Sequence, residues 1–120
     1  MTLTKLKMLS MLTVMIASLF IFSSQALAVQ YFTVSTSSGA PVNMRSGPGT
    51  NYPIMLSIPS GSRVPYYCYA YGTTVTGKYG TSNIWDQIQW KDSRGVVNIG
   101  YVSDTYVYTG SDGPVGYKCN

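Results

Sequence analysis

The sequence predicts a small all-β domain, a barrel or sandwich of about five to seven short strands. Three observations favour this fold class. No segment after residue 28 keeps an apolar stripe with the 3.6-residue period of a helix. Instead, short segments of alternating apolar and polar residues follow one another, separated by turns rich in Gly, Pro and Ser. The 12 glycines and 11 tyrosines also suit strands and turns better than a helical bundle.

The first 28 residues have the features of a secretory signal peptide. Lys5 and Lys7 precede a mostly apolar run over residues 8–22, and Ala26-Leu27-Ala28 supplies a small-x-small cleavage site. An uncleaved membrane anchor is the alternative, but the run is short for a span of about 20 residues. We therefore expect residues 1–28 to be removed from a secreted, extracellular protein with no stable membrane span, and residues 29–120 to form a single domain.

The strands expected in this domain follow from alternation and from the turns between them. The Gly- and Pro-dense residues 46–53 predict an irregular loop, and the Thr-, Gly- and Ser-rich residues 72–83 predict a long polar loop. The expected strands cover residues 29–34, 42–45, 54–58, 63–71, 84–90, 96–102 and 106–108.

Alternation also predicts which face each side chain occupies. In residues 63–71 it places Cys68 on the sheltered face with Tyr66, and points a row of three tyrosines outward. In residues 84–90, Asp86 falls on the side of two isoleucines. We therefore expect Asp86 at a sheet edge or at a bulge. The outward row consists of Tyr67, Tyr69 and Tyr71.

Cys68 and Cys119 are the only cysteines. In an oxidising compartment an even pair forms a disulfide, which here would close a loop of 119 − 68 − 1 = 50 residues and hold the C-terminal tail. The alternative, a reactive thiol, needs a nearby base or positive field, and there is no histidine to supply it. The sequence therefore predicts one structural disulfide.

Composition excludes several kinds of chemistry. Without histidine there is no Ser-His-Asp triad, no Cys-His pair and no imidazole metal site, and two cysteines cannot build a four-cysteine zinc site. Removal of the two leader lysines leaves a net charge of (8 − 2) − 4 = +2 from scattered residues, which disfavours nucleic-acid binding. We expect no catalytic residues, no cofactor and no metal.

Residues 42–53, VNMRSGPGTNYP, resemble the opening signature of bacterial-type SH3 (SH3b) domains. In that family a hydrophobic–Asn–hydrophobic–Arg–Ser–Gly–Pro run is followed by a tyrosine. Residues 58–64 resemble the family's next turn, and residues 100–102 and 106–107 its last strands, although residues 89–98 are longer than its usual hairpin. Over residues 42–119, including both cysteines, the chain is similar to small secreted SH3-domain proteins of actinobacteria and fungi.

The resemblance implies an SH3-like barrel over residues 29–120 and a non-catalytic module that binds cell-wall peptidoglycan, or its peptide or glycan. We expect the first motif to be structural before it contacts ligand. Gly47 and Gly49 can take positive φ on either side of Pro48, and Arg45 can hydrogen-bond the loop carbonyls. The expected loop-structuring residues are Asn43, Arg45, Gly47 and Pro48.

Tyrosines are the candidate ligand contacts. Tyr52, Tyr101 and Tyr106 flank the expected groove beside the Gly-Pro loop, and the outward row adds stacking faces with polar tips. Alternatively, the row only reflects the preference of tyrosine for strands. We expect Trp85 in the core. The expected partner of this monomer is a cell-wall polymer or, alternatively, an extracellular protein that it binds as an inhibitor or effector through the same groove.

A hydrolase is a third hypothesis. Paired carboxylates can hydrolyse glycosides when they lie about 5–9.5 Å apart, and Asp86 with Asp104 is the candidate pair. We expect these two residues to be turn and edge residues instead.

Overall fold

The computed structural model describes residues 28–120, so the expected signal peptide lies outside the described residues except for Ala28. The described chain is all-β, as predicted, and forms one antiparallel sheet of seven strands. A 3-10 turn, η1 (Asp104–Tyr106), joins the last two strands. Within residues 28–120 no helix is long and apolar enough to cross a membrane. The strands are β1 (Gln30–Val34), β2 (Val42–Arg45), β3 (Ile54–Ile58), β4 (Arg63–Gly77), β5 (Gly80–Lys91), β6 (Val97–Ser103) and β7 (Val107–Tyr108).

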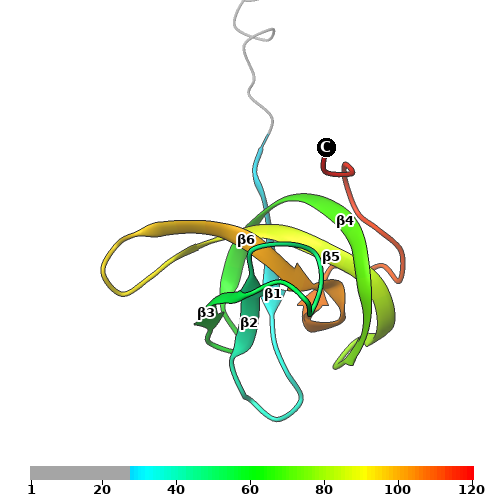
Figure 1. Ribbon diagram of the computed structural model, residues 1–120, viewed down its shortest axis with the longest axis horizontal. Coiled ribbons are helices and arrows are strands. Elements are labelled where there is room, and N and C mark those ends of the chain that lie inside the picture. Colours follow the sequence, from blue (N-terminus) through cyan, green and yellow to red (C-terminus); the bar gives the residue numbers. More distant parts are fainter. Residues whose placement is uncertain (1–27) are drawn as a thin grey trace, which may run out of the picture.

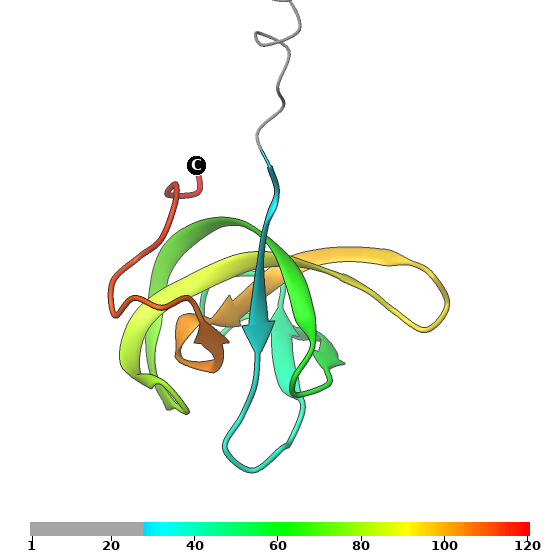
Figure 2. The same ribbon diagram turned by 180° about the vertical axis from the view of Figure 1, so that it is seen from behind.

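The strand order is β3-β2-β6-β5-β4-β1-β7, and the sheet is not closed. The long strands β4 and β5 arch over the shorter ones, and from behind β1 crosses β4 in the foreground (Figures 1 and 2). This curvature lets all seven strands place at least one side chain in a single hydrophobic core. Burying one such side chain contributes about 1.5–3 kcal/mol. The core residues are Val34, Val42, Met44, Ile58, Val64, Tyr66, Ile88, Val102 and Val107.

The prediction of a long loop over residues 72–83 is wrong. β4 continues to Gly77 and β5 begins at Gly80, so this segment is a β-hairpin with a tight turn. The Thr76 and Thr81 hydroxyls lie opposite one another and hydrogen-bond at 2.8 Å. Gly80 takes a φ of 120°, which is open to glycine. β-branched residues here favour strand over loop.

A β-bulge reverses the face predicted for Cys68. The register of β4 against β5 shifts between Tyr66 and Cys68, so that Tyr66 lies opposite Ile88 and Cys68 opposite Gln87. Neighbouring residues on β5 point to opposite faces, so Tyr66 and Cys68 also lie on opposite faces. The single-face prediction fails because one extra residue in β4 shifts the alternation.

Asp86 is also not where the sequence placed it. It lies in the middle of the sheet, with Tyr69 of β4 on one side and Val102 of β6 on the other, and it is only 2% exposed. The register shifts of β4 fall elsewhere, so Asp86 marks neither an edge nor a bulge. Burying a charged carboxyl group is costly unless a polar partner compensates it, and the candidate partner of Asp86 is the Asp104 side chain.

Residues 89–98 form the outer part of a regular hairpin that extends away from the rest of the sheet (Figure 1). The Asp92 carboxylate shapes its turn by accepting the backbone N–H groups of Arg94 at 2.9 Å and Val96 at 3.0 Å. The Val96 hydrogen bond is the main cause of the lowered pKa of Asp92.

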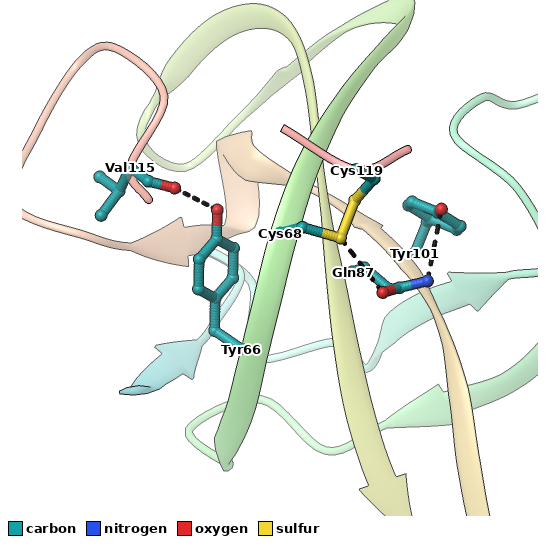
Figure 3. Close-up of a disulfide and its surroundings, with 6 residues drawn as sticks. All are labelled: Tyr66, Cys68, Gln87, Tyr101, Val115 and Cys119. Carbon is teal, nitrogen blue, oxygen red and sulfur yellow. Dashed lines mark hydrogen bonds between the residues drawn. A yellow bond between two sulfur atoms is a disulfide. The ribbon is translucent and has the colours of Figure 1, made fainter. Parts of the chain in front are cut away.

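The predicted disulfide between Cys68 and Cys119 is confirmed, with a Cα–Cα distance of 5.1 Å. It fastens the C-terminal segment to β4 (Figure 3). Tyr69 N donates to Tyr117 O at 2.9 Å, and Cys119 N donates to Tyr69 O at 2.7 Å. On the opposite face of β4, the Tyr66 hydroxyl donates to the carbonyl of Val115. The tail is therefore held by one covalent bond and three hydrogen bonds.

Candidate binding groove

A groove of about 520 Å³ opens beside the Gly-Pro loop, residues 46–53. We call it the Arg45–Lys78 groove after the two cations in its lining. Its walls come from the β1–β2 loop, from β2, from the end of the β4–β5 hairpin and from η1. It is lined by residues 36–38, 40–43, 45, 50, 75–78, 85, 103 and 106.

Arg45 ties the Gly-Pro loop to the edge of this groove. Its Nη1 donates to the carbonyl of Thr50 at 3.1 Å and to that of Tyr52 at 2.9 Å. The loop closes on itself where Ser46 N donates to Pro53 O at 3.1 Å. One guanidinium nitrogen therefore holds two carbonyl groups that would otherwise depend on water.

The two loop glycines are needed for space and not for positive φ, which corrects the sequence prediction. Neither Gly47 nor Gly49 is among the described glycines with positive φ. A Cβ on Gly47 would overlap the ring of Tyr52, and one on Gly49 would lie 2.9 Å from Thr73 Oγ1. The loop therefore packs too closely against its neighbours to accept side chains at these positions.

Trp85 lies beneath this loop and lines the groove. It is 2% exposed, as expected for a core residue, and its Nε1 donates to Thr73 O at 2.9 Å. The loop reaches it because Gly72 lacks a side chain: a Cβ there would overlap the Pro48 carbonyl oxygen. The buried indole therefore supports the floor of the groove and the Gly-Pro loop above it.

The other wall carries Lys78, which the sequence analysis did not single out. Its Nζ donates to Ser35 Oγ at 3.2 Å, and the same hydroxyl hydrogen-bonds the Tyr79 hydroxyl at 3.0 Å. Nζ also lies 5.4 Å from the centre of the Tyr79 ring. Nothing in the sequence distinguishes this lysine, because its position depends on the hairpin that was expected to be a loop.

Of the tyrosines expected to flank a cleft, only Tyr106 lines the groove. The Tyr52 ring packs on Gly47. The Tyr101 hydroxyl accepts a 3.4 Å hydrogen bond from Gln87 Nε2, near the disulfide (Figure 3). Asn43 also lines the groove, and its Oδ1 accepts from Ser57 Oγ at 3.1 Å across the β2–β3 pair.

The tyrosines of β4 do not form one outward row. Tyr69 and Tyr71 make an edge-to-face pair with ring centres 5.8 Å apart, and Lys118 Nζ lies 5.7 Å from the Tyr71 ring centre. Tyr67 lies in the bulge and donates its hydroxyl to Gln89 Oε1. The bulge therefore separates Tyr67 from the other two, and none of the three lines the groove.

The structure brings Asp86 and Asp104 together, although the sequence analysis expected turn and edge residues. Both are buried, and their carboxyl groups lie close enough to shift one another's pKa. Burial is the main cause that raises the pKa of Asp86, to about 9, and the hydrogen bond and negative charge of Asp104 add to it. Burial also raises the pKa of Asp104. The pair therefore holds a proton at neutral pH.

A second observation supports a protonated Asp86. Within residues 28–120, its Oδ2 is the one buried side-chain oxygen or nitrogen without a hydrogen-bond partner. Leaving a charged oxygen in that position would be far more costly than leaving a neutral one. Tyr66 packs nearby, and burial followed by the charge of Asp86 raises the pKa of its hydroxyl.

The described part of the chain has no group of three or more His, Cys, Asp or Glu side chains arranged to hold a metal ion. The lining of the groove offers hydroxyl groups, an amide and two cations. This set can bind and orient a ligand by hydrogen bonding and charge.

The structure is that of a small disulfide-bonded all-β domain with a polar surface groove. No family model matches the chain. The uncharacterized protein YraI of Bacillus subtilis (strain 168) is 71% identical over 116 residues, which cover 97% of this chain and 98% of the relative. The chain therefore belongs to the YraI family.

Proposed function

We propose that this protein is an exported, non-catalytic binding module of the SH3b type that holds cell-wall peptidoglycan in the Arg45–Lys78 groove. The observation that carries the proposal is the position of this groove. Asn43, Arg45 and Thr50, all within the segment that resembles the SH3b signature, line it. Asn43 and Arg45 lie on β2 and Thr50 lies on the loop that follows it, so a strand of the sheet and its adjoining loop present these side chains to the groove.

Two features support export with removal of residues 1–28. β1 begins at Gln30, two residues after Ala28, so cleavage after Ala28 leaves every strand complete. The Cys68–Cys119 disulfide suits an oxidising compartment. The protein recovered outside the cell should have the mass of residues 29–120, which mass spectrometry measures.

We assign Asp86 and Asp104 a structural role within this proposal. Their exposed fractions are 2% and 8%. A glycosidase must place its two carboxyl groups on either side of a bound sugar, and two side chains as buried as these cannot reach a sugar from the solvent. Release of soluble wall fragments by the wild-type protein, lost in the Asp86→Asn variant, would overturn this assignment.

Occluding the groove tests the proposed function. Ser37 lies in the groove lining on the exposed β1–β2 loop, and Ser93 lies on the exposed tip of the β5–β6 hairpin. The Ser37→Trp variant should fill the groove and raise the Kd for insoluble peptidoglycan, measured by pelleting at a series of concentrations, about tenfold, which corresponds to about 1.4 kcal/mol. Ser93→Trp, the same change outside the groove, should pellet like the wild type.

Two results would contradict the proposal. If the oxidised wild-type protein stays in the supernatant at both low and moderate salt, it does not bind peptidoglycan. If both tryptophan variants pellet equally well, binding does not use the groove. Capture of one stoichiometric protein from culture supernatant, blocked by Ser37→Trp, would instead support the alternative that the groove binds a protein partner.

A further inference from the structure

The Arg45–Lys78 groove contains positive charge without any compensating carboxylate. Its lining has two cations, Arg45 from β2 and Lys78 from the β4–β5 turn, and no acidic residue. Within residues 28–120 the sole ion pair is at the tip of the β5–β6 hairpin, where Arg94 and Asp92 lie 3.5 Å apart. Neither cation of the groove is therefore neutralised by the protein.

The four acidic residues are all placed elsewhere. Asp86 and Asp104 form the buried pair, and Asp92 holds the hairpin turn. Asp112 lies in the C-terminal segment, where it lines a separate hollow together with Asp104. The two acidic residues of that hollow, Asp104 and Asp112, are therefore absent from the lining of the groove.

Two other basic residues contact aromatic rings and are not part of the groove lining. Arg63 lies over the Tyr31 ring at 5.2 Å, and Lys118 lies over the Tyr71 ring at 5.7 Å. Lys78 also contacts a ring, that of Tyr79, but keeps its ammonium group at the groove with one hydroxyl acceptor. An ammonium group has three donors, so Lys78 retains donors for a ligand.

We propose that the ligand of this groove carries an oxyanion, a carboxylate or a phosphate, which Lys78 and Arg45 recognise, on a chain rich in hydroxyl or amide groups. The proposal rests on the binding function proposed above and specifies its ligand class. Arg45 spends Nη1 on the loop carbonyls, which leaves the other nitrogens of its guanidinium as donors. The serine and threonine hydroxyls of the lining, such as Ser38, Thr76 and Ser103, recognise the neutral part of the chain.

Lys78 is the residue to change, because Arg45 also holds the loop. We use four soluble probes in two matched pairs: acetyl-alanyl-alanine with its C-terminal amide, and glycerol phosphate with glycerol. Titrations of the full, oxidised protein are followed by NMR. At least one anionic probe should bind about tenfold more tightly than its neutral partner, a difference of about 1.4 kcal/mol that suits one charge-assisted hydrogen bond.

Three variants separate charge at the groove from charge in general. Lys78→Gln should weaken the anionic probe about tenfold, while Lys78→Arg should retain its binding. Lys91→Gln removes the same charge from the exposed end of β5, outside the groove, and should leave binding unchanged. Binding of the anion in Lys78→Gln should also lose part of the salt dependence seen in the wild type.

The relative binding of the four probes identifies the source of the anion, and three outcomes of these titrations would overturn the proposal. Tighter binding of the peptide carboxylate indicates a wall peptide, and tighter binding of glycerol phosphate indicates a phosphodiester polymer. Equal binding of anionic and neutral probes, no binding of any probe, or equal effects of Lys78→Gln and Lys91→Gln would overturn it. If Ser37→Trp abolishes wall pelleting but Lys78→Gln leaves it unchanged, the anionic ligand class is rejected and the proposed wall-binding function stands. If the protein binds an anionic probe but does not pellet with the wall, the anionic ligand class stands and the wall-binding function is rejected.

Discussion

The wild-type protein is expected to lose stability as the pH rises from weakly acidic to alkaline, and the Asp86→Asn variant is expected to lose much less. The pKa of Asp86 rises from 3.8 to about 9 in the folded protein, mainly because burial disfavours the charged form. Between these two values the folded state holds a proton that the unfolded state has released. The free energy of unfolding therefore falls as pH rises, by up to about 1.4 kcal/mol per pH unit.

The groups packed around Asp86 act in the same direction. The pKa of Asp104 is also raised by burial, and that of the Tyr66 hydroxyl is raised by burial and by the charges of Asp86 and Asp104. Asparagine keeps the shape of the side chain and an N–H donor for Asp104, but it never ionises. The variant should therefore be at least as stable as the wild type at pH 8, with a flatter profile.

Urea unfolding at pH 5, 7 and 8.5, with the disulfide intact, measures this effect. The Asp112→Asn variant removes an exposed carboxylate in the C-terminal segment and serves as the matched control, with the wild-type slope. A wild-type profile that is flat or rises over this range would contradict the account of the carboxyl pair. The same conclusion would follow if Asp86→Asn and Asp112→Asn had equal slopes.

Replacing both Cys68 and Cys119 by serine is expected to lower the free energy of unfolding by about 4 kcal/mol, the chain-entropy value for a loop of about 50 residues. This is a large share of the stability of a small domain. The loss should also free the tail from β4, because only the hydrogen bonds at Tyr66 and Tyr69 then hold it.

Denaturant unfolding and amide hydrogen exchange check this second prediction. Exchange should increase at Tyr69 and Cys119, whose N–H groups join β4 and the tail. Serine is chosen because it has the shape of cysteine, and at these half-buried positions its hydroxyl can hydrogen-bond water. A double variant with wild-type stability, or a free thiol in the native protein, would contradict the proposed contribution of the disulfide.

Alternation located one strand correctly, and an apolar run bounded by turn residues located another. The predicted segments 42–45 and 54–58 coincide with β2 and β3. Residues 72–83 were missed because Thr, Gly and Ser are common both in loops and in exposed hairpins. The faces of β4 were missed because the bulge at Tyr67 depends on its pairing with β5, which local sequence does not specify.

The candidate site was predictable only where a residue belongs to a local motif. Arg45 and its loop follow from the spacing of residues 42–53. Lys78 reaches the groove through the β4–β5 hairpin, and the contact between Asp86 and Asp104 follows from the pairing of Trp85 with Ser103 in neighbouring strands. The position of Lys78 and the contact between Asp86 and Asp104 both depend on how distant segments pair in the sheet, and the local sequence does not specify that pairing.

The most direct measurement of the central claim is a crystal structure of the oxidised protein with a soluble peptidoglycan fragment. We expect the fragment in the Arg45–Lys78 groove, with an anionic group beside Lys78 Nζ and the remainder along the hydroxyl groups of Ser38 and Thr76. A fragment bound instead at Tyr67, Tyr69 or Tyr71, with the groove occupied only by solvent, would contradict it.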